Sequence, residues 1–241
     1  AVSMDFWNVR VEDVLVGQES SSYRVNGEIP VIPLESFSDE VASAMEDVSQ
    51  KMEEQDLYLN SSPGYWLRTF DRWADCEEFI GFPLNNPLEK SSLLETANYF
   101  AIAQDAETLN EESQRHCAVA LQGNIKGELQ HVTIDTGYLM GPIRIQMTVS
   151  LYPEGSGMEP GTGGSWNGEA EFEITSGVTG EGIPYTLVVS ETPESDYYND
   201  FSSADAYFVL KNGLYTLDAV SPGRDSGADA KAALEELLAL F

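Results

Sequence analysis

The second half of the chain constrains the fold most strongly, because it contains one β-type segment after another. The segments between residues 116 and 220 are rich in β-branched and aromatic side chains, and Gly or Pro separates them. They read HCAVALQG, ELQHVTIDTGYL, PIRIQMTVSLYP, EAEFEITS, IPYTLVVSE and AYFVLKNGLYTLDAV. Several alternate apolar and polar residues, as half-buried antiparallel strands do. We therefore predict a twisted antiparallel sheet of about six to seven strands.

Turn signals predict how these strands connect. Asn212-Gly213 suits the two-residue turn of a hairpin, so YFVLK and LYTLDAV are expected to pair. The segment PEGSGMEPGTGGSWNG, residues 153–168, contains many glycines and is predicted to be a long flexible loop. It contains no Lys and matches neither Gly-rich phosphate-binding fingerprint, so we do not expect it to hold a nucleotide. Upstream, YWLRTF is predicted to be a short strand.

Two long segments carry helical periodicity. One begins at Ser38, where Asp39 and Glu40 favour the positive end of a helix and apolar residues follow at helical spacing as far as Met52. The other is DAKAALEELLALF near the C-terminus, whose apolar stripe is expected to cover one face of the sheet. Helices packed on an antiparallel sheet place the chain in the α+β class.

A third, shorter helix is marked at both ends, within FDRWADCEEFIGFPLNNPLE (70–89). Asp71 can cap its first turn, and Gly81 can adopt the left-handed conformation that ends a helix. Its apolar residues repeat every three or four positions and are Trp73, Cys76, Phe79 and Ile80. We expect this helix to pack against the sheet and to have a structural role.

The N-terminal region has no clear period. Residues 1–16 are predicted to form a short helix, and SSSYRVNGEIPVIPL is predicted to be extended because it contains two prolines. The expected organisation is a helical and extended N-terminal segment, residues 1–60, followed by an α+β domain, residues 61–241. A single continuous domain over residues 1–241 is the alternative.

The charge of the chain disfavours whole classes of partner. It contains 41 Asp and Glu but 12 Lys and Arg, which gives a formal net charge of −29. A polyanion of this kind repels phosphate backbones and anionic lipid headgroups, so we expect no nucleic-acid binding and no electrostatic docking on membranes. Cations and basic proteins are the partners that it attracts, although charge also serves solubility alone.

The cysteines and histidines give no catalytic or metal-binding motif. Cys76 and Cys117 are expected to be buried free thiols or to form a single disulfide. His116 adjoins Cys117, but neighbours in an extended strand point to opposite faces, so the pair is not expected to share a proton. A dyad would require His131 to reach Cys117 from another strand. Because zinc-type spacing is also absent from the sequence, we expect no catalytic residue, no metal site and no cofactor.

Three carboxylates alternate along one predicted strand: Glu169, Glu171 and Glu173. They lie about 7 Å apart at two-residue spacing and could bind Ca²⁺ or act as the acid and base of a glycosidase. The other interpretation is a solvated outer face over an apolar inner one, which a half-buried strand requires. Aromatic residues that could stack on a sugar are Tyr65, Trp66, Trp166, Tyr197 and Tyr198.

Two stretches carry a family resemblance. WADCEEFIGFPLNNPLE, with a helix that ends in Gly-Phe and a proline-marked exit, resembles a segment of an uncharacterised extracytoplasmic domain family of Gram-positive Firmicutes. AYFVLKNGLYTLDAV followed by ALEELLALF is similar to the terminal hairpin and helix of that family. The similarity covers roughly residues 65–90 and 200–241, and its motifs are structural rather than catalytic.

The resemblance implies a function. Domains of this family often follow the membrane helix of anti-sigma-factor-like proteins, so it implies a non-enzymatic sensor or regulatory ectodomain outside the cell, tethered by an upstream anchor. A protein or small-molecule signal would then shift its conformational equilibrium. Two alternatives stay open: a secreted or lipid-anchored module that binds a carbohydrate or an apolar ligand, and a carboxylate-based hydrolase.

Overall fold

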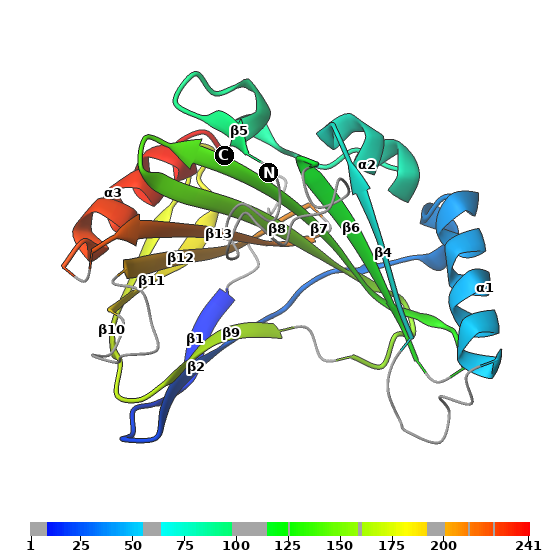
Figure 1. The fold of residues 1–241 in the computed structure, drawn as a ribbon, viewed down its shortest axis with the longest axis horizontal. Helices are drawn as coiled ribbons and strands as arrows, with labels where there is room; N and C mark the ends of the chain where they lie inside the picture. The colour runs from blue at the N-terminus through cyan, green and yellow to red at the C-terminus, as the bar shows by residue number, and fades with distance from the viewer. Residues whose placement is uncertain are drawn as a thin grey trace, which may run out of the picture.

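The fold has three layers, shown in Figure 1. The computed structural model describes residues 9–54, 64–97, 115–124, 126–158, 161–191, 201–211, 213–223 and 225–241. Helices α1 (Asp39–Glu54), α2 (Trp73–Ile80) and α3 (Gly227–Leu238) cover one face of a large sheet, and a three-stranded sheet lies on the other face. Within the described residues, no helix has the length and apolar character needed to cross a membrane.

The large sheet contains ten strands. Across it run β10 (Glu171–Val178), β11 (Pro184–Glu191), β12 (Phe201–Leu210), β13 (Gly213–Pro222), β8 (Ile143–Pro153), β7 (Leu129–Met140), β6 (Cys117–Gly123) and β4 (Gly64–Phe70). β5 (Glu95–Ala97) pairs antiparallel with β7, and β3 (Val31–Ile32) pairs parallel with β8. The mostly antiparallel α+β prediction is confirmed, but the predicted six to seven strands were too few. β3 and β5 contain only two and three residues, which is too few to show the alternation of apolar and polar residues. They are recognisable as strands only by their pairing with β8 and β7.

The hairpin β12–β13 forms as predicted, with its turn shifted by one residue. Leu210 pairs with Gly213, so Gly213 already belongs to the strand, and Lys211 in the turn has φ of 53°. The predictions of α1, α2 and α3 are also confirmed. Gly81 ends α2 with φ of 101°, as expected of a left-handed C-cap. No side-chain cap was found at the start of α2, so Asp71 does not have the predicted role.

The small sheet corrects two predictions about local structure. It consists of β1 (Val9–Leu15), β2 (Ser20–Gly27) and β9 (Gly161–Asn167), in the order β1-β2-β9. The predicted helix at residues 1–16 was wrong over its described part, because residues 9–15 form a strand. The predicted loop at residues 153–168 was wrong over residues 161–167, which pair with β2. This pairing joins two segments far apart in the sequence.

Glycines allow β9 to lie directly against β2. A Cβ atom on Gly163 would lie 2.2 Å from the Tyr23 carbonyl oxygen, and one on Gly164 would lie 2.7 Å from the Tyr23 ring. These glycines therefore permit a close backbone approach, which is a known reason for glycine inside strands. In the sequence, the abundance of glycine indicated a flexible loop, because β2, the strand that pairs with this segment, is far away along the chain.

Replacing Gly164 by Val is therefore expected to destabilise the protein by about 1–3 kcal/mol, because the new side chain must displace the Tyr23 ring. Thermal and urea unfolding would measure the change. Thr162→Val is the matched control, since it adds a Val to the same strand at a partly exposed position. Equal stability of the two variants would contradict the close-packing explanation.

Candidate functional site

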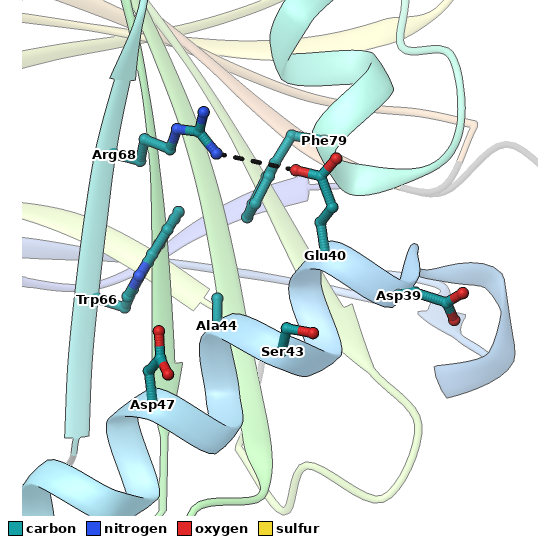
Figure 2. Close-up of a pocket in the computed structure, with 8 residues that line it drawn as sticks. All are labelled: Asp39, Glu40, Ser43, Ala44, Asp47, Trp66, Arg68 and Phe79. Atoms are coloured by element: carbon teal, nitrogen blue, oxygen red, sulfur yellow. Dashed lines mark ion pairs between the residues drawn. The ribbon is translucent and has the colours of Figure 1, made fainter.

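A concave region lies between α1, β4 and α2 (Figure 2). Trp66 and Arg68 stand two residues apart on β4, so both side chains project from the same face of the sheet, toward α1 and α2. Glu40 and Asp47 lie on one side of α1, separated by two helical turns. With Phe79 of α2 these residues line a hollow of about 330 Å³, whose other lining residues are Asp39, Ser43 and Ala44.

The hollow has an aromatic wall. The rings of Trp66 and Phe79 are stacked, with centroids 5.0 Å apart and planes 5° from parallel. Arg68 shows how this wall accommodates a cation: its guanidinium carbon lies 5.1 Å from the Phe70 ring centroid and 5.9 Å from that of Phe79. One of its nitrogens is 3.8 Å from Glu40 Oε2. The site therefore already holds one cation by ring faces and a carboxylate.

A second hollow, of about 280 Å³, adjoins the first and shares three of its lining residues, Glu40, Arg68 and Phe79. Six different carboxylates and two guanidinium groups line the two hollows, which we call the acidic groove. The carboxylates are Asp39, Glu40, Asp47, Asp71, Asp75 and Glu78. Arg115 lies 3.8 Å from Asp71 and donates to the Thr69 carbonyl oxygen at 3.0 Å. The chemistry of the acidic groove favours a cationic ligand.

A second group of reactive side chains lies beneath α2, and we call it the thiol cluster. It contains Cys76 of α2, Glu89 of a short 3-10 helix (Pro87–Lys90), His116 at the bend before β6, and Cys117 at the start of β6. The ligand atoms of Glu89, His116 and Cys117 all lie within 4.8 Å of one another. Cys76 and Cys117 are both free and fully buried, and their sulfurs are in hydrogen-bond contact. The free-thiol interpretation of the sequence is confirmed.

Hydrogen bonds shift the acid–base properties of the thiol cluster. The hydrogen bond with Cys76, with help from His116 and Thr136, lowers the pKa of Cys117 to about 6 although burial opposes this. Burial acts to lower the pKa of His116, but its bonds to Cys117 and Glu89 prevail and raise it to about 10. The His116 ring in turn lowers the pKa of Glu89. The cluster therefore favours a thiolate, an imidazolium and a carboxylate side by side.

The sequence-based treatment of His116 and Cys117 was wrong. Alternation to opposite faces applies inside a strand, whereas His116 precedes β6 at a bend, so its ring lies beside the Cys117 sulfur. His131 instead stacks on Tyr152, with ring centroids 4.8 Å apart, and burial lowers its pKa. The only sequence signal for the cluster was the adjacency of His116 and Cys117, and Glu89 carried none.

The sheet face opposite the helices contains a buried carboxylate pair. Asp205 of β12 and Asp218 of β13 are directly paired across the strands, and their carboxyl groups are hydrogen-bonded. Tyr23 of β2 donates to Asp205 Oδ2 at 3.1 Å, and its oxygen lies 2.7 Å from the Tyr207 oxygen. This polar contact joins the small sheet to the large one. No local sequence pattern indicated this pair, because Asp205 and Asp218 lie within mostly apolar strands.

The predicted carboxylate row does not form a cleft. Glu169, Glu171 and Glu173 are all exposed, and Glu173 pairs with Lys231 of α3 at 2.6 Å. Among the candidate aromatic residues, Trp66 lines the acidic groove and Trp166 packs on Phe172 with centroids 6.4 Å apart.

The remaining candidate aromatic residues add little to the site. Tyr197 and Tyr198 lie outside the described residues, and Tyr65 is placed only as part of β4.

Comparisons with protein-family models, curated proteins and solved structures found no match to this chain.

Proposed function

We propose that this chain is a non-enzymatic binding module that recognises a basic segment of a partner protein in the acidic groove. The observation that carries the proposal is the position of Arg68, a cation held between aromatic rings and Glu40 within the groove. A Lys or Arg side chain of a partner would find the same combination beside Trp66, where Asp47 supplies a further carboxylate.

The overall charge supports this choice of partner. A net charge of −29 attracts basic proteins over a distance and accelerates their approach. The thiol cluster is less suited to catalysis, because a fully buried Cys117 sulfur cannot contact a substrate in this conformation. Binding is therefore the activity that the exposed groups support.

The proposed biological setting is that of an extracytoplasmic sensor or regulatory domain, tethered to the membrane of a Gram-positive bacterium by an upstream anchor. The acidic groove lies between two helices, α1 and α2, that rest on one edge of the large sheet. A ligand that contacts both helices can favour one arrangement of them over another, which is what a regulatory domain requires.

The proposal predicts that lysine-rich peptides bind the intact chain and that the Glu40→Gln, Asp47→Asn double variant binds them about tenfold more weakly. Calorimetric titration would measure both affinities, and added salt should weaken binding to the parent chain. A peptide with Gln in place of Lys is expected not to bind.

Glu46→Gln is the matched control for this experiment. Glu46 is exposed on α1 and lines neither hollow of the acidic groove, so its loss removes a charge without removing a contact. The control should bind the peptide nearly as well as the parent. The groove is not the binding site if the parent chain binds no lysine-rich peptide. The same conclusion follows if Glu46→Gln, which removes one charge, loses half as much binding free energy as the double variant, which removes two.

A further inference from the structure

The thiol cluster contains the donor atoms of a metal site. One sulfur, one imidazole nitrogen and one carboxylate oxygen, from Cys117, His116 and Glu89, lie within 4.8 Å of one another. Within this group, His116 Nε2 lies 2.7 Å from Glu89 Oε1. Because three donors of these types lie together, the cluster matches the number of protein ligands in a zinc site that keeps one position open.

The groups around the donors orient them. His116 Nδ1 lies 3.0 Å from the Ala97 carbonyl oxygen, a contact in which the nitrogen must donate, and this leaves Nε2 as the nitrogen that faces the cluster. The Tyr138 hydroxyl donates to Glu89 Oε1 at 3.1 Å, and Asn86 Nδ2 donates to the Tyr138 oxygen at 2.9 Å. A histidine held by a backbone carbonyl and a carboxylate held by its own donors are features of metal sites.

We propose that Cys117, His116 and Glu89 bind a thiophilic divalent cation of the zinc type. Thiolate and imidazole ligands select zinc over calcium and magnesium, which prefer oxygen ligands. The cation takes the place of the proton between His116 Nε2 and Glu89 Oε1, and Cys117 binds it as a thiolate, so binding releases protons to solvent.

The cation can reach the cluster from the side of Glu89. The Glu89 side chain is 29 % exposed and that of His116 is 10 % exposed, whereas both sulfurs are fully buried. A bound ion would link the start of β6 to the short helix that carries Glu89. The metal site does not depend on the function proposed for the acidic groove.

Cobalt is the probe for this site, because Co²⁺ bound to thiolates gives visible and near-ultraviolet absorption that Zn²⁺ removes by competition. The intact chain would be reduced, stripped of metal with a chelator and titrated with Co²⁺ and then with Zn²⁺. We expect one cobalt per chain with thiolate-to-metal absorption, its loss on adding Zn²⁺, and a higher Tm with Zn²⁺ but not with Mg²⁺.

Two variants and one control decide the outcome. Cys117→Ser should abolish the thiolate absorption, and Glu89→Gln, at the exposed rim, should keep the fold and weaken Co²⁺ binding about tenfold or more. Glu95→Gln removes an exposed carboxylate on β5 outside the cluster and should bind as the parent does. A reduced parent chain without thiolate absorption would overturn the proposal, and so would equal Co²⁺ affinity of the Glu89→Gln and Glu95→Gln variants in the presence of that absorption.

Discussion

The Phe79→Asp variant is expected to lose about 4 kcal/mol or more of its free energy of unfolding. Phe79 is only 3 % exposed, stacks on Trp66 and has its ring centroid 5.6 Å from that of Phe70. Removing a buried Phe side chain costs about 3–5 kcal/mol, and placing a charged carboxylate in the same position adds a desolvation penalty. Arg68 lies near enough to offset part of that penalty but not the lost packing.

Urea unfolding followed by circular dichroism would measure this loss. Ala74→Asp is the matched control, because it introduces the same charge on the exposed side of the same helix, near the end where a negative charge is favourable. The control should unfold within about 0.5 kcal/mol of the parent. A Phe79→Asp variant that unfolds like Ala74→Asp would show that α2 does not depend on burying this ring.

The Asp218→Asn variant is expected to change how stability depends on pH. Burial raises the pKa of Asp205 well above its ordinary range, and the adjacent Asp218 raises it further. Burial also raises the pKa of Asp218 to about 6, against the opposing influence of Asp205 and Arg144. Tyr23 and Tyr207 face the same pair, and burial raises the pKa of both hydroxyls, so they remain neutral donors at neutral pH.

The sign follows from the raised pKa values. A carboxyl group whose pKa is higher in the folded chain stabilises the fold when it is protonated. For Asp218 this contribution is complete below the ordinary value of 3.8 and is lost as the pH rises through about 6. The contribution of Asp205 has the same sign, because burial raises its pKa well above its ordinary range. Asn cannot ionise, so the variant lacks the Asp218 contribution to this pH dependence.

The test compares the free energy of unfolding of the parent and of Asp218→Asn at about pH 4 and about pH 8. Relative to the parent, the variant should be more stable at the higher pH by on the order of 3 kcal/mol than at the lower one. Glu171→Gln, which removes an exposed carboxylate from β10, should show a much smaller change. The same difference between parent and Asp218→Asn at both pH values would contradict a raised pKa at this site.

The elements that could be predicted from the sequence are those whose own residues decide their structure. The apolar stripe of α1 and the ending of α2 at Gly81 depend on side chains within a few residues of one another. Six of the predicted strand segments also carried enough residues to show their character. The small sheet was not predictable, because β9 becomes a strand only where Gly163 and Gly164 meet Tyr23 of β2.

The candidate sites show the same division more clearly. The sequence contained Trp66, His116 and Cys117 as separate candidates, but it could not place Trp66 beside Glu40 and Asp47 of α1. It also could not bring Glu89 to within 2.7 Å of His116, which is 27 positions away. Pairs such as Tyr23 and Asp205, 182 positions apart, leave no local pattern for a sequence to reveal.

The sequence by itself determined the α+β class, the central antiparallel strands, the three helices and an acidic surface that attracts cations. Those features follow from periodicity and composition, which are local or additive properties of the chain. Only the tertiary structure decided the second sheet, the acidic groove, the thiol cluster and the buried pair Asp205 and Asp218. Each of these depends on contacts between segments that are distant in the sequence, and such contacts form only when the sheet folds and brings those segments together.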